Sequence, residues 1–196
     1  IDRFVPCDEG REELVVGEPR NDELASIFRE LEFKALWERF AAGRGGEGKD
    51  YRLCLEESEL LEMVARIRER GTVSVDTETT SREPMRAELV GMSFCLEGNR
   101  ALYLPLAHVY PGAPTQMGAS RALELLKEVL EDEEVLKIGQ NIKYDALVLK
   151  RHGVELRGIH FDTMIASYVI NPGLRQHGLD YLAQHFLDHK MITYPE

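Results

Sequence analysis

The sequence has few cysteines, no excess of positive charge and no long hydrophobic run. Its three cysteines, Cys7, Cys54 and Cys95, are odd in number and widely spaced, which argues against a disulfide framework or a zinc site and favours reduced thiols in the cytoplasm. No apolar run approaches the roughly 18 residues of a membrane span, and no basic-then-apolar leader is present. We therefore expect no transmembrane helix, no signal peptide and no membrane partner.

Positive charge is also scarce relative to negative charge. The chain has 24 Lys and Arg against 35 Asp and Glu, a formal net charge of −11. This balance argues against a simple nucleic-acid coat, which would normally be basic. It does not argue against an enzyme that meets phosphates through bound metal ions, because the carboxylates of such a site add to the negative total.

Composition divides the chain at the glycine-rich stretch AAGRGGEGKD, residues 41–50, which predicts a linker. Before it, apolar residues recur at helical spacings over residues 21–40 and predict one helix. We expect a helical appendage over residues 1–48 and a main domain over residues 49–196. The chain begins at Ile1 without a Met, so we also expect it to be a fragment of a longer protein.

After the linker, hydrophobic periodicity predicts alternating strands and helices in the order β-α-β-β-β-α-β-α-α-α. Strands are expected at 51–55, 72–79 and 134–139, with two more in 88–106 around a turn at 97–99; helices are expected at 56–71, 120–134, 141–153, 161–170 and 177–187. A three-strand meander followed by an αβα unit predicts an α/β fold, with helices packed on a mixed sheet.

The stretch SVDTETTS, residues 74–81, places Asp76 and Glu78 directly behind an apolar strand. Side chains alternate along a strand, so both carboxylates face the same side. Two like charges so close repel, and one shifts toward protonation unless a cation lies between them. Oxygen ligands alone favour Mg²⁺ or Mn²⁺. The alternative is a polar strand end with salt bridges to Arg82 or Arg86.

A second polar group lies in GQNIKYDALVL, residues 139–149. Asn141 and Asp145 are four residues apart and share one face of the predicted helix, with Lys143 and Tyr144 flanking that face. The alternative is an ordinary capped helix, in which Asn141 is the N-cap, Asp145 is exposed near the helix dipole and Tyr144 packs in the core.

These two segments resemble the first two motifs of the DEDD 3′–5′ exonucleases: DTETT at 76–80 and IGQNIKYD at 138–145. The residues around them, from about 20 to 196, resemble the proofreading exonuclease domain of bacterial DNA polymerase I and the segment that joins it to a 5′-nuclease module. The resemblance implies a ribonuclease-H-like fold and a parent chain that also contains polymerase and 5′-nuclease domains. It further implies a cytoplasmic enzyme of the nucleoid.

The resemblance also implies catalytic and metal-binding residues. Asp76, Glu78 and Asp145 would hold two Mg²⁺ or Mn²⁺ ions, of which one activates water and the other stabilises the leaving 3′ oxygen. Glu78 would help to orient the attacking water. The substrate would be a single-stranded or frayed DNA 3′ end, and the product a deoxynucleoside monophosphate.

By the same resemblance, Asn141 and Tyr144, flanked by Lys143, would hold the terminal nucleotides. Tyr194 matches an aromatic position that can stack on DNA, a contact worth about 1–3 kcal/mol per base, although an ordinary terminal tyrosine is an equal alternative. Arg175 is a candidate phosphate contact, resting on one surface arginine.

Other polar residues are expected to have structural roles. Asp162 opens FDTMIAS, where a helix N-cap explains an aspartate well. His177 and His185 fall in a helical region without the spacing of metal ligands, so we expect them to be packing or surface residues.

The family's third motif, Tyr-x-x-x-Asp, does not occur in the sequence, and neither does its histidine version. We therefore expect the fourth carboxylate and the water-orienting tyrosine to be missing, and the fragment to be weak or inactive. Two alternatives remain: a related exonuclease acting on RNA 3′ ends, and a non-catalytic structural domain of a polymerase. The retention of all three carboxylates argues against the second.

Overall fold

The computed structural model describes residues 17–31, 33–41, 49–187 and 189–191. The chain forms two compact units, residues Ile1–Gly45 and Gly46–Glu196. Within the described residues, no helix is long and apolar enough to cross a membrane.

The first unit contains two helices, α1 (Asn21–Glu30) and α2 (Lys34–Ala41), so the prediction of a single helix over 21–40 is wrong. The Phe33 amide donates to the Phe28 carbonyl at 2.8 Å as the chain reverses, and the rings of Phe28 and Phe40 lie 5.5 Å apart between centroids. Trp37 is buried. A continuous helix would leave this apolar stripe without a partner, whereas two short helices cover each other.

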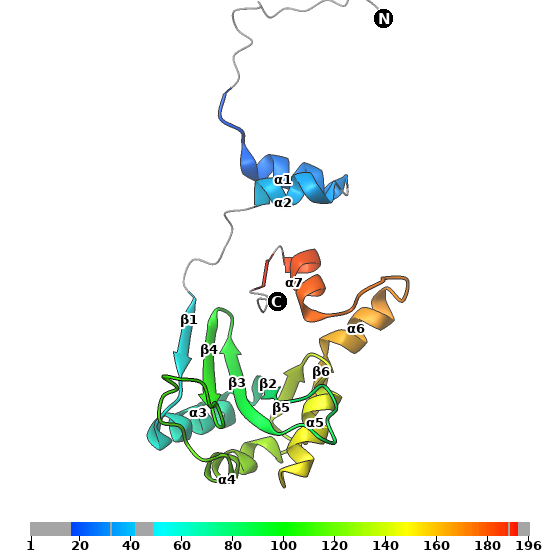
Figure 1. Ribbon diagram of the computed structural model, residues 1–196. Coiled ribbons are helices and arrows are strands. Elements are labelled where there is room, and N and C mark those ends of the chain that lie inside the picture. The colour runs from blue at the N-terminus through cyan, green and yellow to red at the C-terminus, as the bar shows by residue number, and fades with distance from the viewer. Residues whose placement is uncertain (1–16, 32, 42–48, 188, 192–196) are drawn as a thin grey trace, which may run out of the picture. The chain divides into compact units, whose positions relative to one another are not determined.

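The second unit is built on a six-stranded sheet in the order β1-β4-β3-β2-β5-β6 (Figure 1). Its strands are β1 (Asp50–Leu53), β2 (Thr72–Thr79), β3 (Leu89–Glu97), β4 (Arg100–Pro105), β5 (Leu136–Gly139) and β6 (Ile159–Asp162). β2, β3 and β4 form the predicted antiparallel meander. β1 runs parallel to β4, β5 to β2, and β6 to β5, so the sheet is mixed, as the sequence predicted.

The edge strand β6 differs from the prediction, which places a helix over residues 161–170 and no strand before it. β6 is four residues long and its first three residues are exposed, so its brief alternation of apolar and polar residues is too short to identify a strand ahead of a helical pattern. It exists through pairing with β5, where Ile138 is in register with Phe161 and Gly139 with Asp162.

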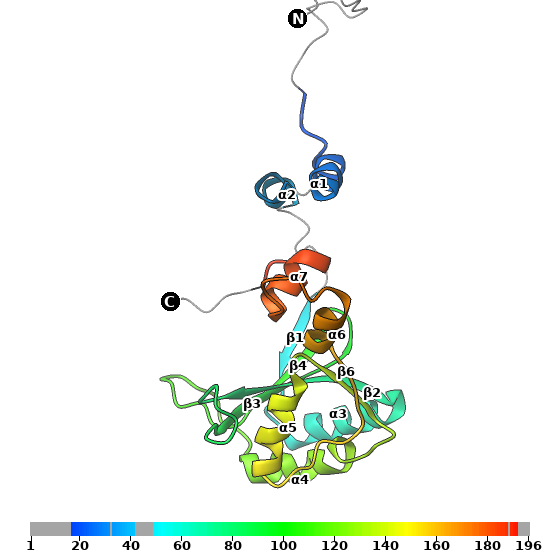
Figure 2. The ribbon, with the colours of Figure 1, turned by 90° about the vertical axis from the view of Figure 1, so that its right-hand side faces the viewer.

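The helices of the second unit are α3 (Glu57–Arg70), α4 (Ala119–Leu130), α5 (Ile142–Arg151), α6 (Thr163–Ile170) and α7 (Leu179–Leu187). As predicted, α3 stops at Gly71, whose φ of +67° suits glycine. α4 ends at Leu130, four residues before the predicted end. α3 and α4 lie on the same face of the sheet (Figures 1 and 2).

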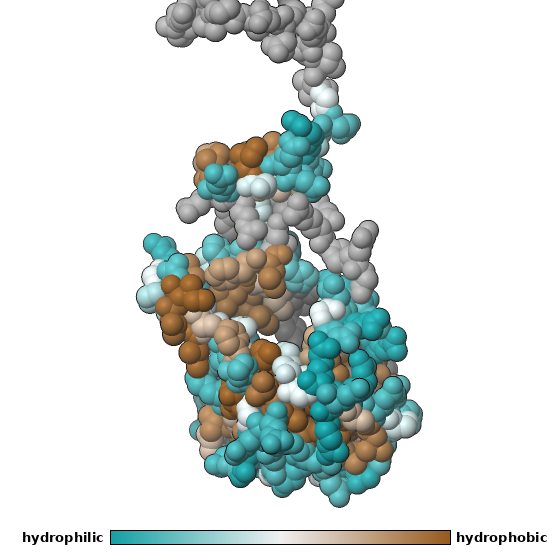
Figure 3. Space-filling view, turned by 180° about the vertical axis from the view of Figure 1, so that it is seen from behind, coloured by the Kyte–Doolittle hydropathy of each residue, from teal (hydrophilic) through white to brown (hydrophobic). Residues whose placement is uncertain are grey.

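The main core lies between this sheet face and α3 and α4. On β2, Val73, Val75 and Thr77 are buried, while Ser74, Asp76 and Glu78 are more accessible. Because side chains alternate along a strand, the core holds one face of β2 in place and the carboxylates point to the other. Exposed apolar residues gather on α6, namely Ile165, Tyr168, Val169 and Ile170, and Figure 3 shows apolar surface on the side of the unit where α6 lies.

One charged residue lies inside this core. Lys137 on β5 is fully buried, and its Nζ donates to the Asp132 carbonyl at 2.6 Å. Burial lowers its pKa from 10.5 to about 8, partly opposed by the Asp132 charge. The sequence predicted a short buried strand here but gave no reason to place an ammonium group in it.

We predict that Lys137→Met removes a pH dependence of stability. Between about pH 8 and pH 10.5 the unfolded lysine keeps a proton that the folded one has lost, so the free energy of unfolding of the wild type rises with pH across this window. The variant lacks this rise and gains on the order of 1–2 kcal/mol at pH 7. Urea unfolding at pH 7 to 10 measures the difference between the two proteins.

The matched control is Lys127→Met, which removes an exposed lysine whose Nζ donates to the Gly153 carbonyl at 3.0 Å. Its free energy of unfolding should change with pH in parallel with that of the wild type. If the free energy of unfolding of Lys137→Met changed with pH in parallel with that of the wild type, the prediction would be contradicted.

Candidate active site

The two carboxylates of β2 are joined by a third from α5. The parallel pairing of β2 with β5 ends at Ser74 and Ile138, so β2 continues past the end of its neighbour. There the Oδ1 of Asp145 accepts hydrogen bonds from the Thr77 backbone N–H at 3.0 Å and from the Thr77 Oγ1 at 2.6 Å. Asp145 is only 2% exposed, which rules out the alternative that it is a solvated residue near the helix dipole.

The three carboxylates interact electrostatically. Burial of the carboxyl group, the charge of Asp145 and the charge of Glu78, in that order, raise the pKa of Asp76 from 3.8 to about 7, although other parts of the Asp76 residue reach solvent. Burial also raises the pKa of Asp145, and its two bonds from Thr77 oppose that rise. A cation beside these three acidic groups would stabilise their ionised forms.

The chemistry of these donors suits a hard divalent ion, since all of them are carboxylate oxygens. Within the described residues, however, no group of three or more His, Cys, Asp or Glu side chains is arranged to enclose an ion. The Oδ1 of Asp145 is already bonded twice to Thr77. The residues therefore fit an ion held by one or two carboxylates and completed by water and phosphate oxygens, which is how Mg²⁺ is usually bound at phosphate-processing sites.

Asp162 determines where α5 begins. Its Oδ1 caps α6 by accepting from the backbone N–H groups of Met164 and Ile165, which confirms the predicted N-cap role. The same carboxylate also accepts from the backbone N–H groups of Asn141 at 3.0 Å and Ile142 at 2.9 Å. It thus supplies the anion at the start of two helices, where free N–H groups and the helix dipole favour one.

The predicted nucleotide-contacting residues of α5 lie at its first turn. Asn141 has a left-handed backbone with φ of +57° and makes no side-chain cap bond; its Oδ1 accepts from the Nζ of Lys143 at 2.6 Å. The ring of Tyr144 packs against the core, and its hydroxyl contacts the Ser81 carbonyl and the Thr79 Oγ1. Tyr144 therefore joins α5 to the segment that follows β2.

Two hollows meet at Glu78 and Thr79. The first, of about 550 Å³, lies toward α5, and the second, of about 420 Å³, lies toward β3 and β4. The first is lined by Thr77, Glu78, Thr79, Thr80, Ser81, Arg82, Asn141 and Tyr144; the second by Glu78, Thr79, Val90, Tyr103 and His108. The carboxylate end of β2 thus borders accessible space on two sides.

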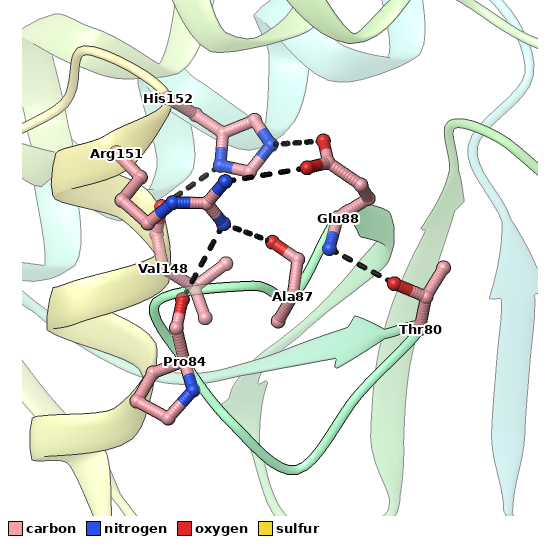
Figure 4. A network of polar contacts seen from close by, with 7 residues as sticks. All are labelled: Thr80, Pro84, Ala87, Glu88, Val148, Arg151 and His152. Atoms are coloured by element: carbon pink, nitrogen blue, oxygen red, sulfur yellow. Dashed lines mark hydrogen bonds and ion pairs between the residues drawn. The ribbon is translucent and has the colours of Figure 1, made fainter.

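The loop between β2 and β3 is fixed at its far end by the C-terminus of α5 (Figure 4). The Arg151 guanidinium donates to the Pro84 and Ala87 carbonyls and to the Glu88 Oε1 at 3.3 Å. The His152 Nε2 lies 3.5 Å from the Glu88 Oε2. With Tyr144 at one end and Arg151 at the other, α5 holds the whole loop that lines the first hollow.

The remaining predicted residues are placed as follows. Arg175 is exposed between α6 and α7 and lines neither hollow. Tyr194 lies outside the described residues.

His177 is buried, with Nδ1 2.8 Å from the Ser167 Oγ and its ring stacked on Tyr168. His185 stacks on Tyr181. His177 is therefore a packing residue and His185 a surface residue, within the prediction that both are packing or surface residues.

Sequence reasoning missed three contributors to this site. The sequence prediction gives Thr77 no role, yet this residue holds the third acid through two bonds. Tyr103 and His108 belong to no motif of the resemblance, and they line the second hollow. Thr77 could have been suspected from its place in a D-T-E triplet, whereas nothing local in the sequence points to the other two.

Comparison with known proteins identifies close relatives by sequence. A family model described as 3′–5′ exonuclease matches residues 51–195. DNA polymerase I of Pseudomonas aeruginosa is 37% identical over 199 residues, covering 94% of this chain and 22% of that protein. DNA polymerase I of Rhizobium leguminosarum is 44% identical over 150 residues, covering 68% of this chain and 15% of that protein. The chain thus spans about a fifth or less of these relatives.

Solved structures show the same fold at low identity. The POL domain of Pol1 from M. smegmatis, in complex with DNA primer-template and dNTP, matches with a TM-score of 0.58 and 22% identity over 71% of this chain and 23% of that one. Brucella melitensis NrnC with bound Mg²⁺ matches with a TM-score of 0.54 and 20% identity, covering 74% of this chain and 65% of that one. Escherichia coli RNase D, an exoribonuclease, matches with a TM-score of 0.53 and 15% identity, covering 73% of this chain and 35% of that one. These likenesses confirm the predicted ribonuclease-H-like fold.

We predict that Thr77→Val weakens the attachment of α5 to β2. The substitution keeps the branched shape but removes the hydroxyl that donates to the buried Asp145 carboxylate, which should cost about 1–3 kcal/mol of unfolding free energy. Urea denaturation at pH 7 measures the loss. The control Thr77→Ser keeps the hydroxyl and should lose less than half as much; equal stability of the valine variant and the wild type would contradict the prediction.

Proposed function

Because this chain belongs to the 3′–5′ exonuclease family of DNA polymerase I, we propose that it hydrolyses the last phosphodiester bond at a DNA 3′ end and releases a deoxynucleoside monophosphate. Within a polymerase this reaction is proofreading. The observation that supports the proposal most directly is geometric: Glu78 borders two hollows, Asp76 lies on the same face of β2, and Asp145 is bonded to Thr77 between them.

In this proposal Asp76, Glu78 and Asp145 are the catalytic and metal-binding residues. Two Mg²⁺ or Mn²⁺ ions bound there would supply a water of lowered pKa and charge stabilisation for the leaving 3′ oxygen. Asp76 and Glu78 present their carboxylates from the open face of β2. Thr77 fixes Asp145 beside them, and Glu78 orients the attacking water.

The first hollow is the proposed place for DNA next to the bond that is cut. Asn141 and Tyr144 line it and hold a nucleotide, while Lys143 positions the amide of Asn141 through the bond between their side chains. A single-stranded or frayed 3′ end fits better than paired DNA, because the terminal nucleotide must leave the duplex to reach the carboxylates. Tyr194 as a stacking residue and Arg175 as a phosphate contact remain part of the proposal.

We place the chain within a longer polymerase, with residues 49–196 as its exonuclease domain and residues 1–48 as the segment after a 5′-nuclease module. The polymerase and 5′-nuclease domains of that parent chain would be its covalent partners, acting on chromosomal DNA in the cytoplasm. The sequence contains no Tyr-x-x-x-Asp motif, so a fourth carboxylate and a water-orienting tyrosine are missing. We therefore propose that the chain by itself cleaves slowly.

RNA 3′ ends are the second candidate substrate, because the fold is shared with Escherichia coli RNase D, an exoribonuclease. That likeness is at 15% identity, whereas the DNA polymerase I relatives reach 37% and 44%. DNA is the better supported choice.

The test is hydrolysis of a 5′-labelled single-stranded DNA oligonucleotide in Mn²⁺, with an RNA oligonucleotide of the same sequence in parallel. We expect stepwise shortening from the 3′ end, faster on DNA. Glu78→Gln should slow it by about 100-fold or more, since the group that orients water is lost. The control Glu69→Gln alters an exposed acid on α3, which packs on the other sheet face, and should match the wild type.

Metal binding is tested separately from hydrolysis. Calorimetric titration of Mn²⁺ should show binding to the wild type and weaker binding to Asp76→Ala. Equal and negligible binding by both proteins would support the non-catalytic alternative. Rates equal to those of a longer chain that includes a Tyr-x-x-x-Asp motif would contradict the proposed impairment.

A further inference from the structure

Strand register brings Tyr103 onto the same sheet face as the catalytic carboxylates. Asp76 on β2 is opposite Ser93 on β3, and Ser93 is opposite Tyr103 on β4. Residues directly opposite each other in an antiparallel pair point to the same side. Tyr103 therefore belongs to the face that carries Asp76 and Glu78, although β3 separates its strand from theirs.

Gly91 lets the Tyr103 ring approach Glu78. Gly91 is the direct partner of Glu78 across the β2–β3 pair. A Cβ at position 91 would lie 2.1 Å from the Tyr103 hydroxyl oxygen and 2.6 Å from its Cζ. The phenol thus occupies the space that a side chain would fill, which is a common reason for glycine inside a strand. The hydroxyl of Tyr103 ends beside the position of Glu78.

His108 completes a polar pair with Tyr103. Its Nε2 lies 2.7 Å from the Tyr103 hydroxyl. The histidine backbone is fixed from both sides by Gln116, whose Oε1 accepts from the His108 N–H at 2.7 Å and whose Nε2 donates to the His108 carbonyl at 2.8 Å. The Tyr110 ring also packs against the imidazole, with ring centroids 5.6 Å apart. The pair is therefore held in one geometry before any ligand arrives.

The pair lines the second hollow, of about 420 Å³, together with Glu78, Thr79 and Val90. No Lys or Arg is among the described residues of this lining, and Glu78 is acidic, so the hollow is unsuited to a phosphate group. A phenol and an imidazole can exchange donor and acceptor roles, which suits a hydroxyl. The two rings and Val90 offer apolar surface for a sugar or base.

We infer that this second hollow holds the 3′-terminal nucleoside of the DNA, and that the Tyr103–His108 pair positions its 3′ hydroxyl next to Glu78. The inference rests on the proposed function. An enzyme that removes nucleotides only from a 3′ end must distinguish that end from the interior of the strand, and the free 3′ hydroxyl is the group that differs. Tyr103 and His108 are thus specificity-determining residues for the DNA 3′ terminus. They line the second hollow, whereas Asn141 and Tyr144 line the first, and Glu78 borders both.

The test compares two single-stranded DNA oligonucleotides that differ only at the end, one with a 3′ hydroxyl and one with 3′-deoxy sugar. Affinity for the full 196-residue chain is measured by fluorescence anisotropy in Ca²⁺, so the readout does not need hydrolysis. The wild type should bind the hydroxyl end about 5- to 10-fold more tightly, the range of one hydrogen bond. Tyr103→Phe and His108→Gln should bind both oligonucleotides equally, at the weaker affinity.

Tyr51→Phe is the matched control, because it removes an exposed phenol from the edge strand β1, and it should keep the full preference. Gly91→Ala should lose the preference without altering either residue of the pair, by displacing the phenol. A loss of folding would lower affinity for both ends together and would not abolish the preference alone, so the ratio of affinities separates positioning from stability.

The two possible failures are distinguishable. If Tyr103→Phe and His108→Gln keep the wild-type preference while Glu78→Gln stops hydrolysis, the subsite is wrong and the exonuclease function stands. If the wild type binds neither oligonucleotide and cleaves neither, the proposed function fails and the inference fails with it.

Discussion

The arrangement of the site depends on one carboxylate that takes no part in the proposed chemistry. Asp162 accepts hydrogen bonds from four backbone N–H groups, two at the start of α5 and two at the start of α6. Helix starts need such acceptors because their first N–H groups have no partner within the helix. By fixing the first residue of α5, Asp162 also fixes which side chains of that helix face β2. A shift of one residue would rotate Asp145 by about 100° away from Thr77.

The second constraint is the place where β5 stops. Its pairing with β2 ends at Ser74, and β2 continues to Thr79. The N–H of Thr77 would otherwise lack a partner inside the fold, and Asp145 accepts from it. The carboxylate of Asp145 is therefore part of the sheet's own hydrogen bonding as well as a candidate ligand. The two bonds from Thr77 stabilise the carboxylate and so offset part of the cost of burying an acidic residue at 2% exposure beside two others.

Short sequence patterns predicted the features of this structure that depend only on residues near one another in the chain. Alternation gave the bounds of β2 as residues 72–79, and Gly71 gave the end of α3. Spacing placed Asp76 and Glu78 on one face and Asp145 on a helix beginning near 141. What the sequence could not provide depends on partners distant in the chain. β6 exists through its pairing with β5, Lys137 is buried because of its place in the sheet, and the break between α1 and α2 comes from two helices covering each other.

If the chain binds a DNA end as proposed, it does so with a formal net charge of −11 over its 196 residues. Most DNA-binding surfaces gain affinity when Lys and Arg displace counterions from phosphates, but Arg82 is the only arginine or lysine among the described residues that line the two hollows. The lining instead offers hydroxyls, an amide and aromatic rings, groups that recognise sugars and bases. In the proposed complex, selectivity for a terminus would come from groups such as Tyr103, and metal ions held by the carboxylates would neutralise the phosphate charge.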